Sequence, residues 1–328
     1  MTQNPNNLGS TTLPENFAGQ VELRTSFGEQ GSVSYKIFQG DNSKPPVFIV
    51  PGFPLGTTQL DNFAATLNRL GNRTVISPNE IDLKGFNAPT VEKEADLYLG
   101  IIQREGLADS DVQVVTHSYG AAVFSKMAEQ ADNKIIGCFK GEHSRVVMIA
   151  PVGTTSEEKF PKLAKRLGRF LKTGVSNGII SDVLLAPSRP SLYKENIRTI
   201  VAHPWKTAGE IRAIKKTKLD FEKLGQLACS PDILIYPVDP MFGESVPEVK
   251  EGIEAQAEHI AGVSMPVRIG ENLAYPYASE TWSYKNGLRT ISRSSHLARH
   301  DELIMDPEST AGAVLNCLEP DRLLKNID

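Results

Sequence analysis

Short apolar runs alternate with longer segments of helical spacing along the first 150 residues of the chain. Residues 20–27 and 33–38 have the composition of strands and are separated by a Glu/Gly turn, which predicts a hairpin. The continuous apolar run 46–50 predicts a strand that is buried on both faces. Further strands are predicted at residues 73–77, 112–115 and 146–150.

Helical patterns separate these runs. Apolar side chains recur at helical intervals over residues 57–70 and 92–103, and a third helix is predicted to extend to Met127. Strands that alternate with helices imply βαβ units, and therefore a mostly parallel, doubly wound sheet covered by helices on both faces. Ligands of such sheets bind beyond the carboxyl ends of the strands. The segments of interest are therefore those that follow Val50, Ser77, Thr116 and Val238.

The pattern changes in the second half of the chain. Strands become scarce over residues 153–231, and strand-like runs return at residues 232–236 and 288–291. We therefore predict an α/β core over residues 19–152 and 232–328, with an inserted helical lid domain over residues 153–231. The Asn, Thr and Pro content of residues 1–18 predicts a disordered tail.

Composition excludes several classes of function. The net charge of −4 over 328 residues gives no electrostatic reason to expect nucleic-acid binding. The three cysteines, Cys138, Cys229 and Cys317, lack CxxC spacing, so neither a zinc site nor a disulfide framework is expected. The opening residues lack basic side chains followed by an apolar run, so we do not expect them to act as a secretory signal, and no apolar stretch approaches about 18 residues. We expect a cytoplasmic protein, and composition does not indicate its oligomeric state.

The strongest chemical signal is the segment Thr116-His117-Ser118-Tyr119-Gly120, which follows an apolar strand and precedes a helix. A tight turn at this point exposes the serine hydroxyl, and the helix N-terminus favours negative charge beside it. The segment resembles the G-x-S-x-G nucleophile elbow of the α/β-hydrolases, with Thr116 in place of the first glycine. The alternative is a plain strand–helix junction with a capping serine.

Two further segments resemble loops of the same family. The first, Pro51-Gly52-Phe53, resembles the His-Gly-x loop after the third strand, with Pro51 in place of His. The resemblance implies that the backbone N–H groups of Phe53 and Tyr119 form an oxyanion hole, and the alternative is an ordinary Pro-Gly turn. The second segment, residues 82–86 (DLKGF), resembles an architectural loop after the fourth strand.

The remaining members of a catalytic triad are implied by the same resemblance. Asp239 follows the strand 232–236, where the family carries the triad acid. His296 and His300 both precede the last predicted helix, and we prefer His300 because it lies seven residues before Pro307. These two histidines have i,i+4 spacing, but the sequence shows no set of acidic or cysteine ligands that converges on them, so no metal site is expected.

The order Ser118, Asp239, His300 is that of the α/β-hydrolases. It implies a serine hydrolase that cleaves a small-molecule carboxylic ester through an acyl-enzyme, without a cofactor. Acyl transfer, C–C bond hydrolysis and lyase chemistry by the same triad remain alternatives, as does a non-catalytic ligand-binding homologue. An epoxide or haloalkane hydrolase is disfavoured, because those relatives have Asp where this chain has Ser118.

Residues 157–172 predict an amphipathic helix in the lid, with a basic polar face. A helix of this kind binds anionic lipid surfaces or acidic substrates in some proteins. We favour a lid helix that packs its apolar face over the sheet and leaves its basic face in solvent.

Overall fold

The computed structural model describes residues 21–28, 31–52, 57–83, 90–134, 136–151, 219–220, 224, 231–235, 259–261, 278–284, 289–294, 303 and 306–319. The predicted tail and nearly all of the predicted lid lie outside these described residues.

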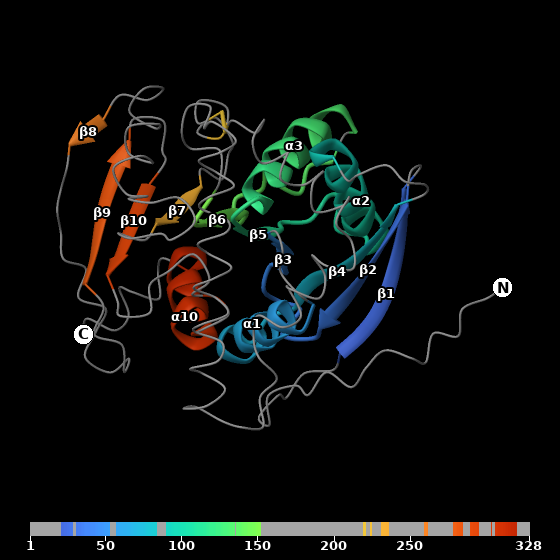
Figure 1. Cartoon of the computed structure of the whole chain (residues 1–328), viewed down its shortest axis with the longest axis horizontal. Coiled ribbons are helices and arrows are strands. Elements are labelled where there is room, and N and C mark those ends of the chain that lie inside the picture. Colours follow the sequence, from blue (N-terminus) through green and yellow to red (C-terminus); the bar gives the residue numbers. More distant parts are fainter. Residues whose placement is uncertain are drawn as a thin grey trace, which may run out of the picture.

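A single twisted sheet organises the described part of the chain (Figure 1). Its ten strands have the order β1-β2-β4-β3-β5-β6-β7-β10-β9-β8. Neighbours from β4 to β10 in that order pair in parallel, whereas β2 and β9 run antiparallel to both of their neighbours. The bounds are β1 Val21–Gly28, β2 Gly31–Phe38, β3 Val47–Val50, β4 Val75–Leu83, β5 Gln113–His117, β6 Arg145–Ile149, β7 Asp232–Ile235, β8 His259–Ala261, β9 Ala278–Tyr284 and β10 Arg289–Ser294.

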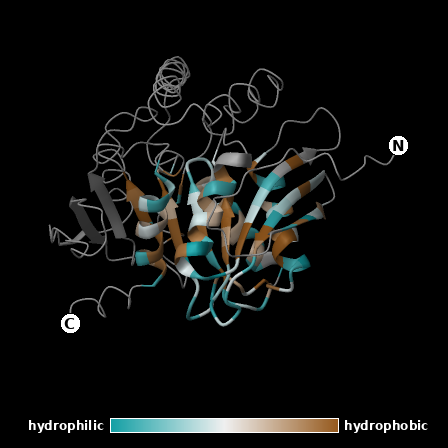
Figure 2. Ribbon diagram, turned by 90° about the horizontal axis from the view of Figure 1, so that it is seen from below, coloured by the Kyte–Doolittle hydropathy of each residue, from teal (hydrophilic) through white to brown (hydrophobic). Residues whose placement is uncertain are grey.

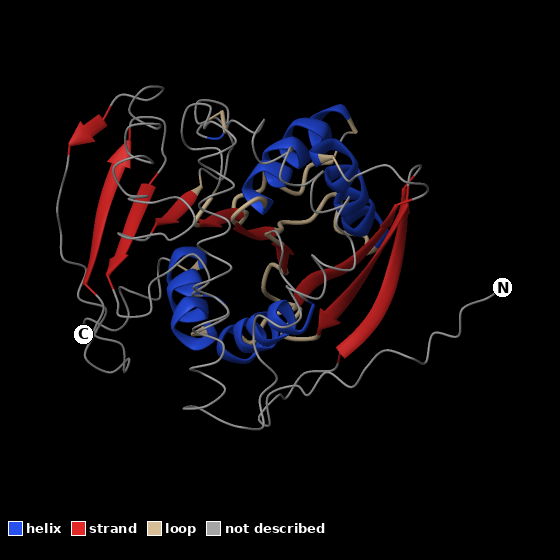
Figure 3. Cartoon of the chain, in the orientation of Figure 1, coloured by secondary structure: helices blue, strands red, loops and turns tan. Residues whose placement is uncertain are grey.

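Two helices cover each face of this sheet within the described residues (Figure 3). On one face lie α1 (Thr57–Gly71) and α10 (Pro307–Leu318), and on the other lie α2 (Val91–Arg104) and α3 (Gly120–Asn133). Local sequence sets where the helices begin. Thr90 caps α2 by accepting a hydrogen bond from the Lys93 N–H, and Asp306 caps α10 in the same way, with Pro307 in the first helical position.

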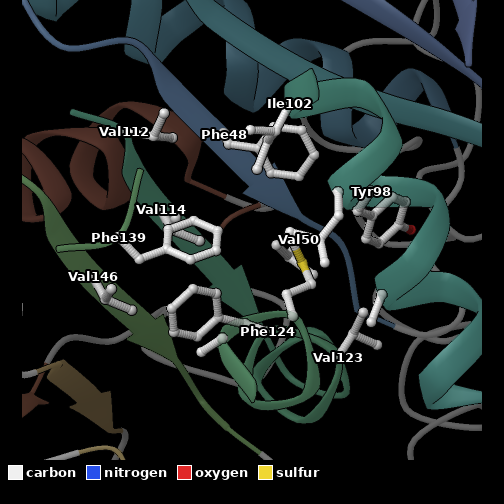
Figure 4. Packing of buried hydrophobic residues seen from close by; sticks show 14 of the residues in the cluster. Phe48, Val50, Tyr98, Ile102, Val112, Val114, Val123, Phe124, Phe139 and Val146 are labelled. Carbon is white, nitrogen blue, oxygen red and sulfur yellow. The ribbon is translucent and has the colours of Figure 1, made fainter. Parts of the chain in front are cut away.

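Each face of the sheet has its own apolar core, and hydrophobic residues gather along the strands (Figure 2). The strand runs are buried on both faces, as expected for central strands of a parallel sheet. On the α2/α3 face, Phe48 packs edge-on against Tyr98, and Phe124 packs edge-on against Phe139 (Figure 4). The α1/α10 face is filled by Ile49, Val115 and apolar residues of the two helices.

The doubly wound sheet predicted from the sequence is confirmed, with two corrections. The strand predicted at residues 73–77 is too short, because β4 continues to Leu83 and includes Asp82 and Leu83, which we had placed in a loop. The long antiparallel partner β2 supplies hydrogen-bonding groups over this length, and an irregularity in the register accommodates Pro78. Strands β8 and β9 were not predicted.

None of the helices in the described part of the chain combines the length and apolar character that a membrane span requires.

A buried polar cluster ties the last helix to the amino ends of the strands. The Arg73 guanidinium, only 2% exposed, donates to the side chains of Gln113 at the start of β5 and Glu319 at the end of α10. The Gln113 amide in turn donates to the carbonyl oxygens of Leu318 and His143, each at 3.2 Å. Because buried polar groups must be paired, this cluster fixes the end of α10 against the sheet.

We predict that Arg73→Met lowers the free energy of unfolding by about 3 kcal/mol, because it removes the cation that pairs with the buried side-chain oxygen of Gln113 and leaves Glu319 only its ion pair of 3.9 Å with Lys44. Urea denaturation measures the change. The matched control is Lys126→Met, which removes an exposed ion pair with Glu129 at 2.9 Å and should lower stability by less than about 0.5 kcal/mol. Equal losses in the two variants would contradict the role of the buried cluster.

Candidate active site

Ser118 lies in a sharp turn between β5 and α3. Its φ angle of +50° is in the left-handed region, which non-glycine residues rarely adopt. Two backbone hydrogen bonds hold the turn: the Ser118 N–H donates to the Ile149 carbonyl at 2.9 Å, and the Ala121 N–H donates to the Ser118 carbonyl at 3.1 Å. This is the backbone geometry of a nucleophile elbow.

Two glycines allow other segments to approach this turn closely. A Cβ atom on Gly120 would lie 2.2 Å from the carbonyl oxygen of Val50, so α3 begins in direct contact with the end of β3. A Cβ atom on Gly52 would lie 2.9 Å from Ser118 Cβ and 2.4 Å from His117 Nδ1. The exit of β3, which carries the predicted oxyanion loop, therefore packs directly against the elbow.

The N-terminus of α3 points its backbone dipoles toward the turn. Tyr119 is the N-cap residue, its side chain makes no capping hydrogen bond, and the first turn of α3 contains no acidic side chain. The partial positive charge of a helix N-terminus is therefore not offset by a carboxylate from that turn. Such an end stabilises an anion that forms on a group bound near Ser118.

Thr116 and His117, the two residues before Ser118, are both buried. Thr116, which replaces the first glycine of the family motif, is paired with Val50 on one side and Met148 on the other, and its side chain is fully enclosed. The β-branched residue thus belongs to the strand itself and does not prevent the left-handed turn at Ser118. Alternation along β5 directs Thr116 and His117 to opposite faces of the sheet.

The residue after β6, Ala150, also has a left-handed conformation, which we did not predict from the sequence. Ala150 has a φ angle of +44°, is buried, and donates its N–H to the Leu234 carbonyl at 2.8 Å. Adjacent strands therefore both leave the sheet through left-handed residues, Ser118 after β5 and Ala150 after β6. Only the Ala-Pro step at 150–151 hints at this in the sequence.

The other predicted site residues, Phe53, Asp239, His296 and His300, lie outside the described residues. The strands before them are described. β5, β6, β7 and β10 are consecutive and parallel, so their carboxyl ends lie at the same edge of the sheet. Asp239 comes four residues after the end of β7, and His296 and His300 come two and six residues after the end of β10.

No group of three His, Cys, Asp or Glu side chains in the described ranges is arranged to hold a metal ion.

Comparisons with known proteins agree with this architecture. No protein-family model matches the chain, and no curated protein matches it. Among solved structures, a hydrolase from Pseudomonas aeruginosa is 14% identical with a TM-score of 0.59, and the match covers 92% of this chain and 99% of that one. A thermophilic esterase from Thermogutta terrifontis is 17% identical with a TM-score of 0.54, over 92% and 98% of the two chains. The epoxide hydrolase CorEH is 12% identical with a TM-score of 0.55, over 92% and 99%.

These likenesses, together with the strand order, show that the chain has the α/β-hydrolase fold predicted from its sequence. At this level of identity they establish the fold alone.

Strain at the elbow gives a testable prediction. A left-handed residue with a side chain is less stable than glycine in the same conformation, so Ser118→Gly should be more stable than Ser118→Ala by about 1 kcal/mol. Thermal or urea denaturation of the two variants measures the difference. The control is Ser125, inside α3, where the order should reverse because alanine is the better helix former. The same order at both positions would contradict strain at Ser118.

Proposed function

We propose that the protein is a serine hydrolase that cleaves a carboxylic ester through an acyl-enzyme formed on Ser118. The observation that carries this proposal is the left-handed Ser118 between β5 and α3, packed against Gly52 at the exit of β3. This arrangement presents a hydroxyl nucleophile beside the N-terminus of a helix, next to a second loop that can donate a backbone N–H.

In the proposed reaction, His300 accepts the proton of the Ser118 hydroxyl as the oxygen attacks the ester carbonyl. Asp239 orients the imidazole and stabilises its protonated form. The N–H groups of Phe53 and Tyr119 donate to the oxyanion of the tetrahedral intermediate. His300 then protonates the leaving alcohol, and a water molecule releases the acyl group by the same steps.

The order of the strands supports the choice of His300 over His296. β10 is three strands away from β5, a separation of about 14 Å at the usual spacing. Two residues, the separation of His296 from the end of β10, span at most about 7 Å, whereas six residues reach about 20 Å. His300 therefore has the longer reach toward Ser118.

The names of the matched structures bear on the choice of reaction. An esterase is among them, which supports ester cleavage, and so is an epoxide hydrolase. Serine at the elbow favours acyl chemistry, because epoxide-opening relatives use an aspartate there. Since Ser118 is 1% exposed, a route for water to the nucleophile decides between hydrolysis and transfer to an alcohol. Product analysis with added alcohol distinguishes these outcomes.

The nucleophile is tested with a fluorophosphonate probe, which labels activated serines. We expect the native protein to be labelled and to hydrolyse at least one p-nitrophenyl ester in a series of increasing acyl length. Ser118→Ala should lose both properties, whereas Ser125→Ala, in α3, should retain both. A native protein that is not labelled, or labelling of Ser118→Ala at the native rate, would refute the proposal.

The base is tested by replacing each histidine separately. His300→Gln should lower kcat by at least a thousandfold, because the serine then lacks a proton acceptor, while His296→Gln should retain most activity. Steady-state kinetics with the best p-nitrophenyl ester measures both. The reverse result would assign the base to His296.

A further inference from the structure

A buried ion pair lies in the contact between α1 and the sheet, which also contains the buried side-chain amide of Asn68, a donor to the Phe38 carbonyl at 3.1 Å. Lys36 of β2 and Asp61 of α1 are joined through their side chains, which are 12% and 2% exposed. The neighbouring residues that α1 buries against the sheet include Leu60, Phe63 and Ala64, all apolar. A charged pair in this setting requires an explanation, because removing both charges from water is costly.

The position of the pair along the sheet relates it to the candidate site. Lys36 is the cross-strand partner of Ser77 in β4, and Ser77 and Ile49 each follow by one residue the pair Ile76 and Phe48 in the register between β4 and β3. Ile49 is one residue before the end of β3. On the helix side, Asp61 is the fifth residue of α1. The pair therefore lies near the carboxyl edge of the sheet, at the end of α1 that follows the predicted oxyanion loop.

We do not expect the Lys36–Asp61 pair to contribute mainly to the free energy of unfolding. Ser77, beside Lys36, is fully buried, and its hydroxyl has no hydrogen-bond partner in the part of the chain that the structure describes. Apolar residues of similar volume in place of a buried ion pair are often neutral or stabilising. An ion pair does, however, fix one helix position opposite one strand position, because its two atoms must meet. Apolar side chains allow a helix to slide by small amounts.

We propose that Lys36 and Asp61 form a positioning pair that sets the oxyanion loop relative to Ser118, an inference that rests on the function proposed above. The described residues on either side of this loop are both held in place. Gly52 packs against His117 and Ser118 at its beginning, and the ion pair fixes the first turns of α1 at its end. Phe53, the proposed donor to the oxyanion, lies between these two anchors in the sequence.

The same helix provides a matched control. Arg69 in the last turn of α1 forms an ion pair of 2.5 Å with Glu308 of α10. That pair lies at the opposite end of α1 and is more exposed, at 29% and 55%. Its loss removes one contact at the end of the helix that is distant from the oxyanion loop, where the Asn68 amide still donates to the Phe38 and Arg73 carbonyls. If position near the loop matters, the two pairs will differ in their effect on catalysis.

The experiment compares two double variants, Lys36→Met/Asp61→Leu and Arg69→Met/Glu308→Leu. The first should keep a Tm close to that of the native protein, since charge is replaced by apolar volume, and should lower kcat for the best ester at least tenfold with KM little changed. Its rate of labelling by the fluorophosphonate should fall in parallel. The second should retain native kcat. Lys36→Arg, which keeps the charge, should retain most of kcat.

Native kcat and labelling rate in a folded Lys36→Met/Asp61→Leu variant would refute the positioning role and leave the proposed function intact. If that variant does not fold, Asp61→Asn, assayed below its Tm, tests the same proposal. A native kcat in Asp61→Asn overturns the positioning role, and a loss of kcat with little change in KM supports it. A native protein that neither reacts with the probe nor cleaves esters refutes the proposed function, and the positioning role with it.

Discussion

The candidate site depends on close backbone packing at the carboxyl edge of the sheet. The end of β3, the turn after β5 and the first residue of α3 meet at distances that exclude a side chain at Gly52 or Gly120. A left-handed residue such as Ser118 is higher in energy by about 1–2 kcal/mol, so the surrounding structure must hold it in place. The backbone hydrogen bond to Ile149 and the enclosed strands on both sides do so.

The buried polar cluster and the candidate site lie at opposite edges of the sheet. At the amino edge, Arg73, just before β4, donates through its terminal guanidinium nitrogens to Gln113 of β5 and to Glu319 at the end of α10. At the carboxyl edge, Ser118 and Ala150 both adopt left-handed conformations. Strain at one edge is tolerated because the strands between the two edges are buried on both faces and cannot shift independently.

The parts of the fold that follow from local patterns were predictable from the sequence. The strand at 46–50 and the helix over residues 57–70 were located to within one residue, because hydrophobic periodicity reports burial directly. The full length of β4 was not predictable, since it depends on pairing with β2 and on an irregularity near Pro78. Among the described residues, the short strand β8 pairs only with β9, and its three residues carry no periodic signal of their own.

For the site, the sequence identified Ser118 because the elbow is local: a strand, a turn and a helix within one short segment. It also singled out Gly52, but the contact of Gly52 with Ser118 joins residues 66 positions apart and required the structure. Ala150 escaped notice for the same reason, because its conformation reflects the hydrogen bond to Leu234 rather than a motif. Asp239 and the two histidines remain predictions that rest on their order after β7 and β10.

The side chain at the left-handed position, Ser118, restricts the possible reactions more than the fold does. The same architecture covers over 90% of an esterase and of an epoxide hydrolase, so it does not by itself select a reaction. A hydroxyl at this position forms an ester with an acyl group and needs a base to remove its proton. In the proposed reaction an oxyanion then develops on the carbonyl oxygen of the substrate, and the N-terminus of α3 and the exit of β3 flank Ser118, beside which that charge would appear. The proposed catalysis at Ser118 therefore depends on the positions of β3 and α1, because the proposed donor Phe53 lies between these two elements in the sequence.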